Sequence, residues 1–295
     1  MHDPDFIAEH RANPKAFSRQ RLRTFPVLVA FLLCAFKGSL QSLLDELFAT
    51  LHGPLTRVVT KSAVSQARQK LKASVFEALN ERLLCSLAAL LPEPRWRGLR
   101  LVAVDSTTLR LPPWLENQAV FGVQFDSGGH PYVLARALGL FSTTSRLMIK
   151  TVLGRFDDAE RALLARVLPH QASDDLLIMD RGFPAVWLFT LLQQRGIPFL
   201  ARMDGTQWPE VEAFLRSGRT ETVLTRQVTD HARRQAQAAS VELIDKTLNL
   251  RLIKTILPNG TIEALTTSLT DANAYPAEDF ASLYHAAGGG VKRTV

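Results

Sequence analysis

The sequence predicts an α/β protein with a mixed sheet, preceded by a helical region. Up to about residue 92, apolar residues recur at the three-to-four-residue spacing of helices. After residue 98 they gather in short runs rich in Val, Leu and Ile, which is typical of buried strands. The expected order is three strands, a helix, a strand, a helix and a strand, which indicates an α/β core. A chain of 295 residues has room for two or three packed units.

The first region is expected to hold four helices. They cover residues 25–36, 42–51, 61–71 and 73–91. Gly53-Pro54 stops the second, and Thr60 is placed to cap the third. The first is the longest apolar stretch, yet at about a dozen residues it is too short to cross a membrane, which takes ~20 residues. The N-terminus lacks a secretory signal pattern, so we expect a soluble, cytoplasmic protein with no membrane partner.

The second region is expected to form the sheet. Strands are predicted at residues 99–105, 132–141, 147–153, 176–180 and 198–203, with helices at 159–168 and 183–195. The pattern from residue 204 to 269 is polar and β-rich. Its basic patch comprises His231, Arg233 and Arg234. Within it, Asn259-Gly260 separates two apolar segments, which predicts a β-hairpin. We therefore divide the chain into residues 1–92, 93–203, 204–270 and 271–295.

Composition narrows the class of protein. Hydrophobic residues make up 46% of the chain, which excludes a disordered polypeptide. The formal charge of +7 suits a polyanionic partner such as nucleic acid, because basic side chains near phosphates release counterions. Cys34 and Cys85 sit in apolar surroundings, so we expect two buried thiols and a reducing compartment.

The predicted third helix has two different faces. Small apolar residues, Ala63, Val64 and Ala67, lie on one side. The polar side carries Lys61, Ser65, Gln66, Arg68 and Lys70. This combination suits a recognition helix, whose polar face meets base edges and phosphates. It equally suits a helical bundle with a solvated charged face, and the residues alone leave both interpretations open.

Two acidic residues follow apolar strands at matching positions. Asp105 ends the run Leu101–Val104, and Asp180 ends the run Leu176–Met179. Strand ends of α/β sheets are common places for functional sites. Two carboxylates on adjacent strands repel unless a cation bridges them, and hard oxygen ligands suit Mg²⁺ or Mn²⁺. The alternative is that each aspartate only caps a turn after its strand.

Four segments carry a resemblance to a known family. They are Val104-Asp105-Ser106-Thr107, Asp180-Arg181-Gly182-Phe183, residues 62–71 and residues 281–285. Together they resemble the first-aspartate motif, the second-aspartate motif, the N-terminal DNA-binding segment and the closing motif of DDE-type insertion-sequence transposases, in the insertion sequence 4 family. The resemblance covers nearly the whole chain.

The resemblance implies a ribonuclease-H-like catalytic core with a β-rich insertion at 204–270, and a DNA-binding region at 1–92. It implies metal-dependent cleavage and transfer of double-stranded DNA at element terminal repeats and target sites, by a dimer bound to nucleoid DNA. Asp105 would lie between two Mg²⁺ or Mn²⁺ ions, and Asp180 would hold one of them. Arg181 would contact a DNA phosphate, or else form a surface ion pair.

The closing motif departs from the family pattern. Counted from Tyr284, the family has an arginine at position 287 and a glutamate at position 291, where this sequence has Ala287 and Val291. The tail that follows contains three glycines, and we expect no helix there. Codons exist for residues 286–294 that give Arg-Trp-Gly and acidic residues in a shifted frame. We therefore expect a truncated or frameshifted end at 271–295.

Three functions are compatible with these features. The first is a DDE transposase whose catalysis is impaired by loss of the third acid. The second is an inactive DNA-binding remnant that inhibits transposition through mixed assemblies. The third is a nuclease on the same fold that cleaves without strand transfer. Metal-dependent cleavage separates the first and third from the second.

Overall fold

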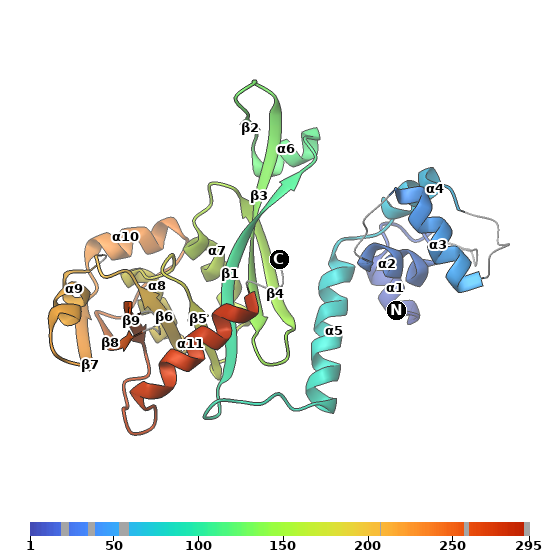
Figure 1. Ribbon diagram of the computed structural model, residues 1–295. Coiled ribbons are helices and arrows are strands. Elements are labelled where there is room, and N and C mark those ends of the chain that lie inside the picture. Colours follow the sequence, from blue (N-terminus) through green and yellow to red (C-terminus); the bar gives the residue numbers. More distant parts are fainter. Residues whose placement is uncertain (19–23, 35–38, 53–58, 207, 257–259, 292–295) are drawn as a thin grey trace. The chain divides into compact units, whose positions relative to one another are not determined.

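The computed structural model describes residues 1–18, 24–34, 39–52, 59–206, 208–256 and 260–291 (Figure 1). The chain forms two compact units, Met1–Leu90 and Leu91–Val295. The first consists of helices, and the second contains a nine-stranded mixed sheet with helices. This architecture confirms the α/β class with a mixed sheet that the sequence predicts, and it agrees with a ribonuclease-H-like core.

The first unit contains the four expected helices and a short additional one. They are α1 (Pro4–His10), α2 (Phe25–Leu33), α3 (Leu40–His52), α4 (Lys61–Arg68) and α5 (Ser74–Leu90). The hydroxyl oxygen of Thr60 accepts a hydrogen bond from the Ala63 backbone N–H, so Thr60 caps α4 as expected. In the described part of the chain, no helix is long and apolar enough to span a membrane.

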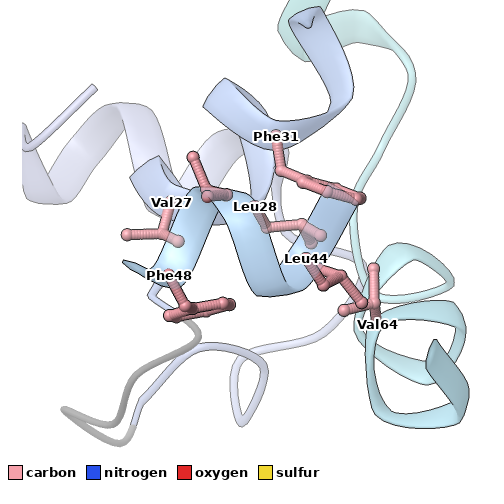
Figure 2. Close-up of a pocket in the computed structure, with 7 residues that line it drawn as sticks. Val27, Leu28, Phe31, Leu44, Phe48 and Val64 are labelled. Atoms are coloured by element: carbon pink, nitrogen blue, oxygen red, sulfur yellow. The ribbon is translucent and has the colours of Figure 1, made fainter. Parts of the chain in front are cut away.

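Helix α2 is apolar on every side because it serves two small cores. Leu28 and Phe31 pack with α3 and α4, whereas Phe25 and Val29 pack with α1 and the start of α5. Figure 2 shows a pocket in the first core that is lined entirely by apolar side chains. It lies among α2, α3 and α4, where Val64 points toward the other two helices.

The prediction that both cysteines are buried is wrong. Cys34 and Cys85 are free and exposed. Cys34 is the C-cap of α2, where the chain leaves the core, and its thiol donates to the Ala30 carbonyl at 3.3 Å. Cys85 lies on α5, a helix in which Val75 is the buried residue. Apolar neighbours in the sequence therefore did not predict whether these thiols are buried.

The sheet of the second unit has the strand order β2-β3-β1-β5-β6-β9-β8-β7, with β4 paired to β3. Its strands are β1 (Arg100–Leu111), β2 (Gln124–Phe125), β3 (Pro131–Ser142), β4 (Met148–Arg155), β5 (Asp175–Met179), β6 (Phe199–Met203), β7 (Glu221–Gln227), β8 (Thr247–Ile256) and β9 (Ile262–Thr267). Among the described strands, the parallel pairs are β1–β5 and β5–β6. The remaining pairs are antiparallel.

Alternating residues of the central strands pack into two separate cores, one on each face of the sheet. On one face, Leu177 and Met179 pack with α7 (Glu160–Val167), α8 (Val186–Gln194), α9 (Pro209–Arg216) and α10 (Asp230–Ala238). On the other face, Leu176 and Ile178 pack beneath Phe280 and Leu283 of α11 (Ala277–Val291). Figure 1 shows α11 lying across this second face.

Strand β1 is longer than predicted. The expected strand ended at Asp105, whereas β1 continues to Leu111 and pairs with β3 along that length. Thr107 and Thr108 favour this extension because β-branched residues suit extended backbone. The extended part of β1 and its partner β3 carry β2 and α6 (Leu115–Phe121) at their far end (Figure 1).

The region after β6 also differs from expectation. The region at 204–270 contains α9 and α10 besides its strands, and the basic residues His231, Arg233 and Arg234 lie on α10. The guanidinium of Arg233 donates to the backbone carbonyls of Leu243 and Asp245. The basic residue at the centre of the predicted patch therefore holds a loop in place.

The helix α11 corrects the expectation of a non-helical tail. It continues through the three glycines to Val291, although glycine in a helix interior costs about 1 kcal/mol relative to alanine. Burial of Phe280 and Leu283 against the sheet anchors the helix upstream. Glu278 and Asp279 in its first turn favour the helix dipole.

The predicted hairpin is confirmed. Strands β8 and β9 pair antiparallel, with Ile256 opposite Ile262. Gly260 has φ +81°, a left-handed conformation that favours glycine. Asn259 lies outside the described residues.

The register between β1 and β5 begins at a buried ion pair. Arg100 and Asp175 are the first residue pair of the two strands. Their side chains meet in a two-pronged contact, Nε to Oδ1 at 2.6 Å and Nη2 to Oδ2 at 2.8 Å. Asp175 is fully buried, and its hydrogen bond raises the pKa of Arg100. This contact favours one alignment of the strands.

We predict that Arg100→Met destabilises the second unit by about 3–5 kcal/mol, because it leaves a buried carboxylate without its cation. Urea unfolding followed by tryptophan fluorescence measures this, since Trp96, Trp114, Trp187 and Trp208 all lie in this unit. The matched control is Arg95→Met, which breaks the exposed ion pair with Asp174 and is expected to cost roughly 0–1 kcal/mol. Equal losses in the two variants would contradict the structural role given to Arg100.

Candidate functional site

Asp105, within β1, and Asp180, the residue after β5, both lie at the end of the parallel β1–β5 ladder. The last residue pair of the parallel β1–β5 ladder is Val104 opposite Met179, and each aspartate is the next residue of its chain. Leu101 of β1 and Ile178 of β5 face the core beneath α11. Continued alternation therefore directs both aspartates to the face of the sheet that α11 covers.

The two aspartates occupy different positions relative to their strands. Asp180 follows the end of β5, where the backbone turns and the Phe183 N–H donates to the Asp180 carbonyl at 3.2 Å. Asp105 instead lies in the middle of β1, at the point where the pairing with β5 stops. Its position at a strand end is thus wrong for β1 as a whole, yet correct for the parallel ladder.

Nearby backbone groups hold both carboxylates. Oδ1 of Asp105 accepts the Ser106 N–H at 2.8 Å, and Oδ1 of Asp180 accepts the Gly182 N–H at 2.8 Å. Both acidic residues are exposed. The carboxylates are therefore oriented by neighbouring backbone groups and accessible from solvent, as a site for an external ligand requires.

Electrostatics at this edge disfavour ionisation of Asp105. Partial loss of hydration raises the pKa of its carboxyl above the ordinary value, and the negative charges of Asp180 and Glu160 raise it further. The hydrogen bond from the Ser106 backbone acts in the opposite direction. The negative charges of these carboxylates therefore repel one another, and a bound cation would offset this repulsion.

Glu160 is a neighbour that the sequence did not single out. It is the first residue of α7, and its Oε1 accepts a hydrogen bond from the Ser106 hydroxyl of β1. A methyl group added at Gly182 would lie 3.1 Å from Asp180 Oδ1 and 3.2 Å from Glu160 Oε2. In a sequence, a glutamate at the start of a helix is ordinarily explained by the helix dipole. The position of Glu160 along the chain therefore could not reveal that it lies near Asp180.

Tyr284 connects α11 to the same edge. Burial raises the pKa of its phenol to about 12, the charges of Asp180 and Glu263 add to this, and Arg202 and Arg181 act against it. Position 291 follows Tyr284 by two helical turns, so the backbone places it on the same side of α11. The family glutamate expected there would thus belong to the helix that covers the aspartates.

The donor set fits a hard divalent cation. Asp105 and Asp180 offer carboxylate oxygens, the ligands that Mg²⁺ and Mn²⁺ favour. Among the residues that the structure describes, no three His, Cys, Asp or Glu side chains converge closely enough to enclose a metal.

The residues predicted to bind DNA lie at the surface of their units. On α4, Val64 and Ala67 are buried, so this helix packs through its small apolar face. The exposed predicted residues are Lys61, Ser65, Gln66, Arg68 and Lys70. In the second unit, Arg181 is exposed in the turn after Asp180. Exposure agrees with both interpretations of α4, a DNA-binding face and a solvated face.

Comparison with known proteins connects this geometry to a family. The family model described as "Transposase DDE domain" matches residues 96–286, which contain both aspartates. "Transposase InsG for insertion sequence element IS4" of Escherichia coli (strain K12) is 25% identical over 230 residues. The alignment covers 77% of this chain and 50% of that protein, so the chain spans about half the length of this relative.

These matches confirm the resemblance to insertion sequence 4 transposases, and proteins of this class are enzymes that typically use a divalent metal. The family match covers more than half of the chain and includes the edge where Asp105 and Asp180 meet. The chain belongs to the transposase DDE domain family.

Proposed function

We propose that this protein cleaves phosphodiester bonds at the ends of an insertion sequence and joins them to target DNA. The observation that carries the proposal is that Asp105 and Asp180 directly follow Val104 and Met179, the last residue pair of the parallel β1–β5 ladder. Adjacent strands of a sheet lie about 4.8 Å apart, and two-metal sites have metal ions about 3.5–4 Å apart. Aspartates that directly follow paired residues of adjacent strands therefore suit a shared pair of Mg²⁺ or Mn²⁺ ions.

In this proposal, Asp105 contributes to both metal positions and Asp180 to one. When bound, such ions generate a nucleophile at neutral pH and stabilise the leaving oxygen of the phosphodiester. The Ser106 and Gly182 N–H groups each occupy one oxygen of an aspartate and thereby set its orientation. Arg181, exposed beside Asp180, contacts a DNA phosphate.

We assign a role to each of the four segments of the chain, following the family pattern. Residues 1–92 bind the terminal repeats through the exposed face of α4, and residues 93–203 form the first part of the catalytic core. Residues 204–270 form the β-rich insertion, and residues 271–295 return to the core. The protein acts as a dimer on double-stranded DNA. The support for DNA as partner is the family match and the net charge of +7.

A second candidate function is inhibition of transposition by a DNA-binding protein with little catalysis. The observation in its favour is that Ala287 and Val291 stand where the family motif has arginine and glutamate. Such a protein would bind element ends and form mixed assemblies with an active transposase. Strand cleavage by the purified chain distinguishes the two candidates.

We predict slow Mn²⁺-dependent cleavage of element-end DNA by the chain, since one glutamate of the family motif is replaced. Asp105→Asn and Asp180→Asn should each lower the rate by at least about 10²–10³-fold, because each removes charge that holds the metals. Val291→Glu should raise it. Asp230→Asn, an exposed aspartate on α10, is the matched control and should leave the rate unchanged. DNA binding with no cleavage by either the chain or Val291→Glu would favour the inhibitor.

We predict that Asp105→Asn stabilises the metal-free protein at neutral pH. A pKa raised in the folded state means that ionising Asp105 costs folding free energy, so stability falls as pH rises through that pKa. The gain at pH 7 should be roughly 0.5 kcal/mol, since solvent screens an exposed carboxylate. It should shrink toward acidic pH, as the pH falls through the raised pKa and the wild-type carboxyl becomes protonated.

Urea unfolding with EDTA at pH 7 and at acidic pH measures this difference. Added Mn²⁺ should reverse the order, because only the wild type then gains stability from the bound metal. A variant less stable than the wild type at pH 7 without metal would show that the folded protein does not disfavour ionisation of Asp105.

We predict that Arg68→Gln with Lys70→Gln weakens binding of the full chain to element-end DNA. Each lost phosphate contact should lower the dependence of log affinity on log salt by about 1, so the double variant should lose about 2. Fluorescence anisotropy over a salt series measures both quantities. Arg195→Gln with Lys246→Gln removes the same charge from exposed positions of the other unit and is the control. An identical salt dependence in the wild type and both double variants would identify α4 as a solvated face.

A further inference from the structure

The chain that follows α1 is paired with the chain that follows α4. Arg11 and Leu71 form an isolated antiparallel bridge. Beside it, the Ala12 N–H donates to the Lys70 carbonyl at 2.8 Å, and a second backbone hydrogen bond of 2.9 Å closes the bridge on the other side. The connection between α1 and α2 is therefore fixed next to the C-terminal end of α4, the helix with the proposed DNA-binding face.

This connection begins with an ordered turn that leads into the core of the first unit. The Asn13 side chain accepts a hydrogen bond from the Lys15 N–H at 3.1 Å, which is a turn typical of asparagine. Ala16 is buried, and the ring of Phe17 packs edge-on against Phe25 with ring centroids 5.4 Å apart. The backbone of Lys15 is therefore held in place by contacts before and after it.

Charge is unevenly distributed along the first unit. Residues 11–23 contain five Lys or Arg and no Asp or Glu, and residues 57–72 likewise contain five and none. The acidic residues of this unit belong to α1 and its N-cap, α3 and α5. The backbone pairing thus brings together two segments whose charged residues are all basic.

The basic side chains at this junction are available to an external anion. Lys15, Arg68 and Lys70 are exposed, and Arg11 is half-buried. Among the described residues none of these four forms an ion pair, whereas Arg82 on α5 pairs with the aspartate that caps α1. Cations that gather without anionic partners repel one another and attract a polyanion.

The position of the turn suits a contact with the backbone of a DNA duplex. The eight residues of α4 make a helix about 12 Å long, and the major groove of B-DNA is about 12 Å wide. When such a helix lies in the groove, a segment beside its end comes near the phosphates at the groove edge. Contacts to these phosphates fix the orientation of the helix without reading the sequence.

We propose that the α1–α2 connection, through Arg11 and Lys15, binds phosphates of the same DNA duplex that α4 contacts. The inference rests on the proposed binding of DNA by α4 and adds a second contact that is independent of base sequence. The hydrogen bonds to the chain after α4 keep the two contacts at a fixed separation. The bound group is the phosphodiester backbone, so element ends and unrelated duplexes are held equally at this turn.

The test is binding of the full-length chain to two fluorescent duplexes, one with the element end and one of arbitrary sequence, followed by anisotropy over a salt series. Arg11→Gln with Lys15→Gln should lower the dependence of log affinity on log salt by about 2 for both duplexes. At about 0.1 M salt this corresponds to a loss of affinity of roughly 10–100-fold. Arg11→Lys with Lys15→Arg keeps both charges and should bind like the wild type.

The control is Arg195→Gln with Lys246→Gln, which removes the same charge from exposed positions of the other unit and should leave the salt dependence unchanged. If the wild type binds both duplexes and Arg11→Gln with Lys15→Gln has the same salt dependence, the role of the turn is wrong while DNA binding by the chain stands. A loss confined to the element-end duplex would also overturn it, because both duplexes offer the same phosphates.

Absence of binding to either duplex by the wild type would overturn the proposed DNA-binding function as well. If the double variant does not fold, Lys15→Gln alone changes one exposed side chain and should lower the salt dependence by about 1. An unchanged salt dependence in a folded Lys15→Gln variant would then overturn the proposal.

Discussion

Strands β1 and β5 run parallel and in register from the pair Arg100–Asp175 to the pair Val104–Met179, and the candidate site depends on this alignment. The buried two-pronged contact between Arg100 and Asp175 favours it at one end. A slip of one residue would move the leucines of β5 to the wrong faces and separate the aspartates. The energy that aligns the strands is therefore the energy that brings the two carboxylates together.

Ionisation of Asp105 at the candidate site lowers the stability of the fold. Asp105 loses hydration and meets the charges of Asp180 and Glu160, so its ionised form is disfavoured. Local rules that favour stability are often broken where a protein binds or reacts, and the surrounding core compensates. Here the compensation comes from two apolar cores that hold β5 fully buried on both faces.

Helices α7 and α11 approach the same edge from opposite faces of the sheet. The first brings Glu160 to Ser106 and Gly182, and the second brings Tyr284 within range of the charge of Asp180. Both helices therefore contribute to the electrostatic surroundings of this edge.

The sequence by itself determined the α/β class, most helices and strands of both units, the hairpin at Gly260 and the two aspartates, because these follow from local periodicity, turn chemistry and short motifs. Tertiary structure alone decided the exposure of Cys34 and Cys85, the extension of β1 and the persistence of α11 through its glycines. It also decided the place of Glu160, whose partner Ser106 is 54 residues away along the chain. Contacts of that separation arise only when the sheet and its helices pack, and no local pattern in the sequence encodes them.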